Sequence, residues 1–516
     1  MSLPVSVLKP LTLADIHAVA RDDATVEALD PKNPNPQVQR ILKSADWVRT
    51  AIGEIETRQE PIAYYGINTG FGDNAGRATF RHSQDAERLS RNLLLSHSVG
   101  TGDPLPEEVV RTALLIRVNS LAKGYSGVRL EVINTLIAML NRRVFPVVPS
   151  QGSLGASGDL APLAHMVIPI SAPLPGEEPD RPGATGYCFW QGQIVTGREA
   201  MAAAGIPQIR LGAKEGVALI NGTAISLALG LLALHDAKAL IRTSELALAL
   251  TIEAVRGFRD PFLPPINVIR SKWQAQAAAH ILNHLEGSTL ARGNVDVDLS
   301  STEGPPQDPY CIRCAPAVLG AAYHALDHVE TALLGELDAT TDNPLIFTGS
   351  DPGASDYLPR HIKVISGGNF HGAPVGYVMD YLGLVITDLT SIAERRIFML
   401  TDPKLNRGLP PFLIAEPPAE AGLNSGLMIA QYTAASLVSE NKSLAHPASV
   451  DSIPSSANRE DHVSMSTIAA RKAAQIVANA RHVGALELLC AAQALRLRQE
   501  ISPADRPGRG SREALG

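Results

Sequence analysis

AISLALGLLAL, residues 224–234, is the longest run of apolar and small residues in the chain. It lies within a segment, about 211–258, whose pattern is helical and apolar on nearly every side, which is typical of a helix buried among other helices. The run stops at His235 and Asp236, well short of the roughly 20 residues that a membrane-spanning helix needs. The stretch therefore predicts the core helix of a helical bundle and not a membrane span.

The composition supports a large helical protein. The chain has 516 residues, of which 45% are hydrophobic and only 4% aromatic. Abundant Ala and Leu with few aromatic residues favour helices packed on helices over a sheet sandwich. The net charge of −7 gives no basic surface for nucleic acid or for a membrane, so we expect a small-molecule partner.

The hydrophobic pattern predicts an all-α fold, an elongated bundle of long central helices. We divide it into an N-terminal domain, 1–210, which is rich in loops, and a long-helix bundle, 211–516. Two irregular zones stand out, the Gly/Asn-rich loop 61–76 and the Pro/Gly-rich stretch 171–197, which ends in a short hairpin. The polar tail after Ile501 is expected to fray. Further helical segments are predicted at 36–58, 84–145, 267–287, 311–338, 370–400, 420–441 and 464–499.

The cysteines indicate an intracellular setting. Four cysteines (Cys188, Cys311, Cys314 and Cys490) in so long a chain do not form a disulfide framework. Cys311 and Cys314 form a CxxC pair, but no further ligands at zinc-site spacing lie nearby. The N-terminus lacks the pattern of a secretory signal. We therefore expect plain thiols, no metal, and a cytoplasmic location.

QGSLGASGDLAPLAH, residues 151–165, places small residues directly before a helix. It lacks the Lys of a phosphate-binding loop and does not have the G-x-S-x-G spacing of a nucleophile elbow. One interpretation is a tight turn with a helix N-cap at Ser157 or Asp159. The other is chemical: the Gly158 nitrogen closes a ring on the Ala156 carbonyl carbon, and loss of water converts Ser157 to a dehydroalanine. The product would be an electrophile made from the chain itself.

Several motifs together closely resemble the aromatic amino acid ammonia-lyases, the family of histidine, phenylalanine and tyrosine ammonia-lyases. The resemblance covers nearly the whole chain and implies elimination of ammonia by a 4-methylidene-imidazol-5-one (MIO) group, formed within 151–160 from Ala156, Ser157 and Gly158 with no external cofactor. It also implies a homotetramer whose active sites are each drawn from three chains. The motifs are GSLGASGDLAPLAH (152–165), YGINTGFG (65–72), NGTA (221–224), QDPYCIRC (307–314), TDNPLIF (341–347), SGGNFHG (366–372) and SENKSLAHPASVDSIPSSANREDHVSM (439–465).

The resemblance also implies roles for individual residues. Tyr65, in the lid loop 61–76, matches the catalytic base, although the residues alone do not distinguish it from Tyr64. Arg313 matches a carboxylate clamp, for which a guanidinium is better suited than an ammonium group; its alternative is a surface ion pair. The positions that surround the ring or the backbone of the substrate are matched by Asn221, Gln307, Tyr310 and Asn369. For the amides, helix-end capping is the alternative.

The substrate depends on fewer positions. Ser96 and His97 match the selectivity pair of the histidine enzymes, and Glu440 matches their acidic residue. One imidazole and one carboxylate can satisfy both ring nitrogens of a histidine substrate. We therefore expect a carbon-nitrogen lyase that converts L-histidine to trans-urocanate. A tyrosine or phenylalanine lyase, an aminomutase, a lyase on a modified histidine and a helical scaffold without the ring remain open. The departures from the family pattern are Ala224, Ala315, Ala317 and Arg459.

Overall fold

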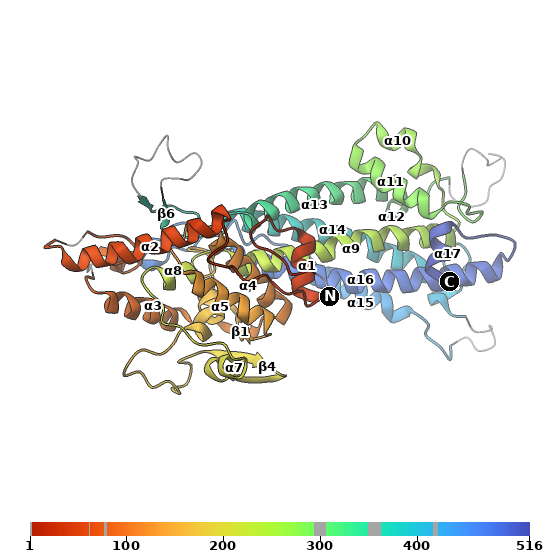
Figure 1. Cartoon of the computed structure of the whole chain (residues 1–516). Coiled ribbons are helices and arrows are strands. Elements are labelled where there is room, and N and C mark those ends of the chain that lie inside the picture. Colours follow the sequence, from red (N-terminus) through yellow and green to blue (C-terminus); the bar gives the residue numbers. More distant parts are fainter. Residues whose placement is uncertain are drawn as a thin grey trace. The chain divides into compact units, whose positions relative to one another are not determined.

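The computed structural model describes residues 3–60, 62–76, 80–293, 306–348, 363–415 and 422–515. Helices make up most of the described chain, and its few strands are short (Figure 1). The predicted fold class, mainly α, is confirmed.

The chain folds into two compact units, and neither is a continuous stretch. Unit 1 consists of 1–232, 331–379 and 447–471, and unit 2 of 233–330, 380–446 and 472–516. Several long helices begin in one unit and end in the other. The boundary at 210/211 stays a prediction.

Unit 1 contains the shorter helices of the N-terminal half. Helix α4 is buried along nearly its whole length, and α1 and α5 pack against it. Helices α3, α6 and α8 pack against one another, so residues near their ends are brought together. The bounds are α1 Leu13–Arg21, α2 Pro36–Thr57, α3 Ser83–His97, α4 Glu107–Ala122, α5 Leu130–Asn141, α6 Leu160–Val167, α7 Gly197–Ala203 and α8 Glu215–Ile220.

Short antiparallel sheets fix the loops of unit 1. Strand β1 (Thr101–Pro104) follows α3 and pairs with β3 (Pro149–Gln151), which leads into the loop 152–159. This pairing places the end of α3 beside that loop. Strands β4 (Tyr187–Trp190) and β5 (Gln193–Thr196) form the predicted hairpin, and β4 also pairs with β2 (Phe145–Pro146). A third sheet joins β6 (Leu345–Phe347) to β7 (Lys363–Ile365).

Helix α9 (Ala224–Ala254) contains the apolar run with which the sequence analysis began. Every residue of 224–234 is buried, which confirms the predicted core helix. Two helices in the described ranges, α9 and α14 (Ala373–Thr401), are long and apolar enough to cross a membrane, but 78% and 50% of their apolar windows are buried inside the protein. Burial of this extent is typical of core helices.

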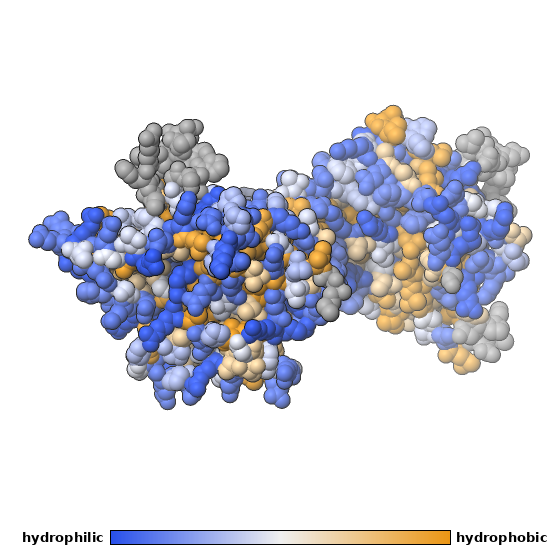
Figure 2. Space-filling view, viewed as in Figure 1, coloured by the Kyte–Doolittle hydropathy of each residue, from blue (hydrophilic) through white to orange (hydrophobic). Residues whose placement is uncertain are grey.

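Unit 2 is a bundle of long helices that lie side by side (Figure 1). Their contacts include an ion pair between the fully buried side chains of Arg396 and Glu487, and Arg396 also donates to Ser244 Oγ at 3.1 Å. Figure 2 shows apolar side chains gathered over α10, where Ile269 is exposed. Besides α9 and α14, the helices are α10 Pro264–Val268, α11 Lys272–His284, α12 Tyr310–Arg313, α13 Ala315–Leu337, α15 Met428–Leu444, α16 Ser466–Ile501 and α17 Arg509–Leu515.

The prediction of a fraying tail is wrong, because residues 509–515 form helix α17. The Arg509 nitrogen donates to the Glu286 carbonyl at 2.8 Å, and the Thr289 nitrogen donates to the Arg506 carbonyl at 2.9 Å. Gly510 lies so close to His284 that a Cβ there would be 2.2 Å from its ring nitrogen. Contacts with residues more than 200 positions away hold the tail, and its local sequence does not reveal them.

Candidate active site

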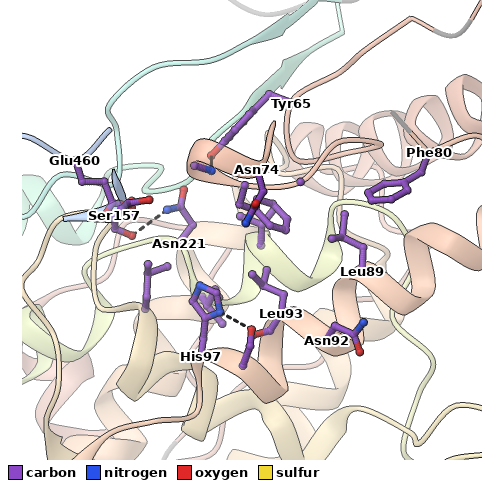
Figure 3. Close-up of a pocket in the computed structure, with 18 residues that line it drawn as sticks. Tyr65, Asn74, Phe80, Leu89, Asn92, Leu93, His97, Ser157, Asn221 and Glu460 are labelled. Carbon is purple, nitrogen blue, oxygen red and sulfur yellow. Dashed lines mark hydrogen bonds between the residues drawn. The ribbon is translucent and has the colours of Figure 1, made fainter. Parts of the chain in front are cut away.

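A pocket of about 540 Å³ lies within unit 1 (Figure 3). Its volume is within the range of small-molecule sites. It is formed by the loop 65–74 and Phe80, helix α3, the loop at residue 157 with the beginning of α6, helix α8 with Asn221, and residues 456–460. The polar side chains that line it are Tyr65, Asn74, Asn92, Ser96, His97, Ser157, Asn221, Ser456 and Glu460.

The loop at one wall of the pocket has backbone conformations that favour glycine. Gly155 and Gly158 have φ of +66° and +75°. Gly158 pairs with Gly222 in a parallel bridge, and a Cβ on Gly158 would lie 2.3 Å from the Gly222 oxygen. No side chain fits at residue 158, and a glycine nitrogen there has no side chain of its own to hinder attack on the Ala156 carbonyl carbon. The residues present therefore fit the formation of the MIO group.

Asp159 anchors this loop from inside the protein. It stands at the N-cap position of α6, but its side chain makes no capping bond there. The carboxylate instead accepts hydrogen bonds from Ile225 N at 3.0 Å, from Ser226 N at 2.8 Å and from Thr467 Oγ1 at 2.6 Å. Burial raises its pKa, and these hydrogen bonds oppose that rise. Ser157 and Asp159 were the two predicted N-cap residues, and Asp159 occupies the N-cap position of α6. Its carboxylate, however, binds backbone N–H groups in the first turn of α9.

Asn221 follows α8 directly and reaches the loop. Its Nδ2 donates to the Ser157 carbonyl oxygen at 2.9 Å, while its Oδ1 is buried without a partner in the described part of the chain. A buried oxygen with a free lone pair is an acceptor that a ligand's N–H group can satisfy.

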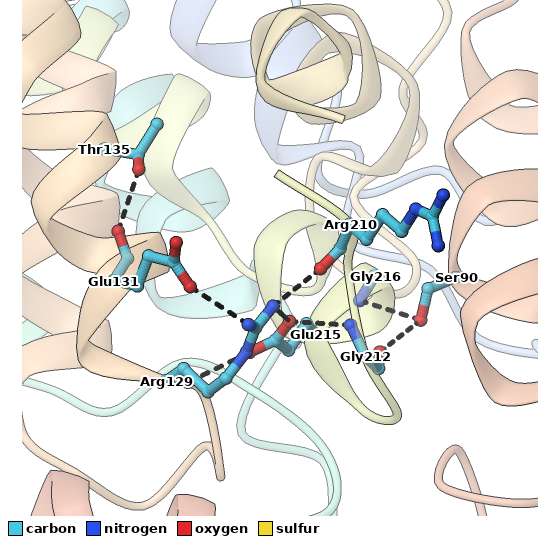
Figure 4. Close-up of polar contacts among 8 residues, drawn as sticks. All are labelled: Ser90, Arg129, Glu131, Thr135, Arg210, Gly212, Glu215 and Gly216. Atoms are coloured by element: carbon cyan, nitrogen blue, oxygen red, sulfur yellow. Dashed lines mark hydrogen bonds and ion pairs between the residues drawn. The ribbon is translucent and has the colours of Figure 1, made fainter. Parts of the chain in front are cut away.

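The beginning of α8 is clamped by a polar cluster (Figure 4). Glu215 is almost fully buried and accepts from Arg129 Nε at 2.9 Å, from Arg129 Nη2 at 2.8 Å and from Gly212 N at 2.7 Å. Ser90 of α3 donates to the Gly212 carbonyl at 2.7 Å and accepts from Gly216 N at 3.3 Å. These bonds fix α8 on α3, and thereby fix the position of Asn221.

Tyr65 lies in the lid loop and lines the pocket. Its hydroxyl accepts from Gly72 N at 3.4 Å, and its ring meets Phe71 edge to face at 6.2 Å. Tyr64 instead packs with a different core cluster, so the structure separates the two tyrosines. Arg459 Nε lies 3.6 Å from Asp73 Oδ1 and joins the lid loop to the segment 455–460.

Ser96 and His97 occupy the last turn of α3, facing the pocket. Ser96 Oγ lies 3.0 Å from His97 Nδ1 and also donates to the Leu93 carbonyl at 3.2 Å. Burial lowers the pKa of His97, and the negative charge of Glu460 works against this effect. His97 is therefore a neutral imidazole near neutral pH.

The carboxylate in this pocket is that of Glu460, which the sequence analysis did not select. Glu460 Oε1 accepts from Ser157 Oγ at 2.6 Å and Oε2 from Ser455 Oγ at 3.0 Å. The predicted acid, Glu440, is exposed on α15 in unit 2 and does not line the pocket. Its role in substrate selection stays a prediction. Glu440 and Glu460 lie in the same motif, 439–465. The charged segment REDH, 459–462, was the sequence feature that could have pointed to Glu460.

The structure does not bring the remaining predicted residues into this pocket. Tyr310 is 68% exposed, and the Arg313 guanidinium lies 4.4 Å above its ring. Arg313 Nε also donates to the Asp308 carbonyl at 2.9 Å. Gln307 and Asn369 are exposed. Gln307, Tyr310 and Arg313 belong to unit 2, and the roles of all four stay predictions.

Metal-binding geometry does not occur in the described residues, where no three His, Cys, Asp or Glu side chains gather to hold an ion. All four cysteines are free thiols.

Comparisons with known proteins agree with this geometry. The family model "Aromatic amino acid lyase" matches residues 11–515. The chain is 46% identical over 490 residues to a histidine ammonia-lyase of Caldanaerobacter subterraneus, covering 95% of this chain and 87% of that protein. The solved tyrosine aminomutase from Streptomyces globisporus is similar with a TM-score of 0.85 and 33% identity, covering 99% and 91% of the two chains. The solved histidine ammonia-lyase from Trypanosoma cruzi is similar with a TM-score of 0.82 and 36% identity, covering 99% of this chain and 88% of that one. This chain belongs to the aromatic amino acid lyase family.

Proposed function

We propose that this chain is a carbon-nitrogen lyase that eliminates ammonia from L-histidine and releases trans-urocanate. Histidine ammonia-lyases are similar to it along nearly its whole length. The observation that carries the proposal is one pocket that holds Tyr65, His97, Ser157, Asn221 and Glu460.

Ala156, Ser157 and Gly158 would form the MIO group, an electrophile that takes up the substrate's amino group and makes it a better leaving group. The close approach of Gly158 to Gly222 supports this assignment. Asn221 Nδ2 donates to the carbonyl oxygen of Ser157 and is placed to stabilise negative charge on that oxygen. No external cofactor is required by this chemistry.

Tyr65 is the base of the proposed reaction. Its hydroxyl is in the pocket, and within the described ranges that oxygen accepts a single long hydrogen bond, from Gly72 N at 3.4 Å. In its phenolate form this oxygen can therefore accept the β-proton of a bound amino acid and become a neutral phenol. Gly66 and Gly72, both at positive φ, allow the tight course of this loop over the site.

Histidine as the substrate is supported by two polar side chains that line the pocket, those of His97 and Glu460. A neutral His97 can donate or accept one hydrogen bond to the substrate imidazole, and Glu460 can accept another. Ring formation removes the Ser157 hydroxyl, so Glu460 Oε1 loses its 2.6 Å partner and becomes available to the ligand. A purely hydrocarbon side chain would leave Oε1 of this carboxylate without a hydrogen-bond donor from the ligand, although Oε2 keeps its bond from Ser455 Oγ.

We infer that the enzyme is a homotetramer in the cytoplasm and that other copies complete each pocket. The carboxylate clamp Arg313, with Gln307, Tyr310 and Asn369, would come from those copies, and the exposure of Tyr310 supports this arrangement. Exposed apolar and aromatic side chains on α14 and α15 also favour association. They are Tyr377, Tyr381, Leu384, Ile429 and Tyr432.

The test is turnover of an amino acid panel, followed by the absorbance of the conjugated product. The kcat/KM for L-histidine should be well above the values for L-tyrosine, L-phenylalanine and N-methylated or thiolated histidines. Absence of turnover with L-histidine overturns the proposal. A rearranged β-amino acid as product would indicate an aminomutase. Co-expression of the Tyr65→Phe and Arg313→Ala chains should restore activity that each variant lacks alone, because mixed tetramers contain intact pockets.

A further inference from the structure

Arg117, in the middle of α4, is a fully buried arginine that contacts the active-site turn from behind. Its Nη1 donates to the Asn221 carbonyl at 3.2 Å and to the Thr341 carbonyl at 2.9 Å. Its side chain is inaccessible to solvent, and its Nε and Nη2 have no hydrogen-bond partner in the described ranges. All of these residues belong to unit 1.

Burying an arginine in this way has a desolvation cost. Burial lowers the pKa of Arg117 to about 10, which the carboxylate of Asp342 partly offsets. Asp342, however, is already paired at 2.6 Å with Lys214, another fully buried cation. Two cations thus share one anion in the interior, although a hydrophobic residue of similar volume would avoid this desolvation cost. The bonds to the two carbonyl groups are what the guanidinium provides.

The contacts of Gly222 connect this guanidinium to the ring-forming loop. A Cβ on Gly222 would lie 2.3 Å from Arg117 Nη1 and 2.7 Å from Thr341 Oγ1. The carbonyl of Gly222 accepts from Asp159 N at 2.7 Å and touches Gly158. Gly222 is therefore enclosed between Arg117 and the loop that carries Gly158, and neither neighbour leaves space for a side chain.

We propose that Arg117 is a positioning residue for MIO formation, holding the 221–222 turn against Gly158. This inference rests on the proposed function. In the ring closure, the Gly158 nitrogen bonds to the Ala156 carbonyl carbon, and the carbonyl oxygen leaves as water with the Gly158 and Ser157 amide hydrogens. A second water takes the Ser157 hydroxyl and α-hydrogen, so no oxidant is needed.

The geometric requirement gives the expected size of the effect. The attacking nitrogen must be held against the carbonyl carbon, and a misplacement of about 1 Å can slow a reaction on the order of 100-fold. Without Arg117, nothing else in the described residues bonds to the Asn221 carbonyl. The bonds from Asp159 N to Gly222 and from Asn221 Nδ2 to Ser157 remain, but the turn loses its support from α4 and can shift relative to Gly158. Ring formation should then slow by roughly 10- to 100-fold.

The experiment measures maturation of the full-length protein by intact mass, not by activity. Arg117→Met and Arg117→Lys are purified beside the wild type, Ser157→Ala and a matched control, Arg91→Met. Arg91 is also buried and donates to two backbone carbonyls, those of Ser171 and Ala184, but it contacts neither the turn nor the loop. Samples are followed from purification over days, and folding is checked by circular dichroism and thermal unfolding.

The wild type and Arg91→Met should have lost two waters, whereas Arg117→Met should begin largely unmodified and lose them slowly. Arg117→Lys can donate to one of the two carbonyls, so its rate of water loss should lie between those of the wild type and Arg117→Met. Complete maturation of folded Arg117→Met at the wild-type rate overturns the inference. If Arg117→Met does not fold, Arg117→Lys decides: wild-type maturation of this variant overturns the inference equally. A wild type that has lost no water instead contradicts MIO formation itself, which is a distinguishable failure.

Discussion

Ser157 Oγ donates a 2.6 Å hydrogen bond to Glu460 Oε1 across 303 positions of the sequence. Ser455 Oγ holds the other carboxylate oxygen at 3.0 Å, so Glu460 is fixed from two sides before any ligand binds. On the proposed chemistry, one of these partners disappears when the serine hydroxyl is lost. Glu460 then faces the pocket as an oriented acceptor.

Glu460→Gln should lower kcat/KM for L-histidine by about 10- to 100-fold, because a charged hydrogen bond to the substrate is replaced by a neutral one. The matched control is Glu27→Gln, an exposed carboxylate outside the predicted site, which should remain within about twofold of the wild type. Steady-state kinetics measure both. Equal losses, or a loss only in Glu27→Gln, would show that the pocket carboxylate does not serve the substrate.

Ser157→Ala should keep the fold but abolish turnover, with a loss on the order of 10³-fold or more, because the electrophile cannot form. Its intact mass should equal the mass calculated from the sequence. Ser98→Ala is the control, since this hydroxyl donates only to the Leu94 carbonyl at 2.8 Å. Undiminished turnover of Ser157→Ala would contradict the mechanism.

His97 should make the protein sensitive to acid. Burial lowers the pKa of His97 in the folded state below 6.5, the ordinary value that applies to the unfolded chain. At a pH between the folded-state pKa and 6.5, the unfolded chain therefore binds a proton that the folded chain does not. The corresponding stability is complete above pH 6.5 and is lost as the pH falls through the folded-state pKa. The thermal midpoint of the wild type should therefore fall more between pH 7.5 and 5 than that of His97→Gln. The exposed His482→Gln should behave as the wild type, and parallel curves for all three proteins would refute the assignment.

Arg396→Met should destabilise unit 2 by about 3–5 kcal/mol, because it leaves the buried carboxylate of Glu487 without its cation. The double variant Arg396→Met/Glu487→Met should recover much of the loss. Denaturant unfolding of both variants provides the comparison. A double variant that is less stable than the single one would show that the pair contributes more than charge neutralisation.

Arg459→Gln should change KM for L-histidine by less than about fivefold, because the contact with Asp73 is exposed and such pairs contribute about 0–1 kcal/mol. Added salt should raise KM of the wild type more than that of the variant, since salt screens the attraction between the lid loop and residue 459. Identical salt dependence in the two enzymes would exclude this ion pair from lid closure.

Hydrophobic periodicity was sufficient for the fold class. The buried run 224–234 and the hairpin 187–196 follow from local pattern, because helical and strand periods record which faces are covered. The tail helix α17 could not be predicted, since backbone bonds from distant residues such as Glu286 hold it.

The site was predictable only where a residue stands beside a distinctive motif. Ser157, Tyr65 and Asn221 meet in one pocket because the paired strands β1 and β3 and the packed helices α3 and α8 bring their segments together. Glu460 was missed because it shares one long motif with Glu440, and only the folded backbone shows that residue 460 lines this pocket. The side chain of Asp159 likewise binds a helix that starts 65 positions later, which no local capping rule anticipates.

On the proposed chemistry, the contact between Gly158 and Gly222 would also restrict when the reactive group can arise. Residue 158 gains this neighbour only when the segment around 222 has docked. The electrophile would then be a product of completed folding, and nascent or misfolded copies would stay chemically inert. A thiol-reactive group would not be exposed on unfinished protein.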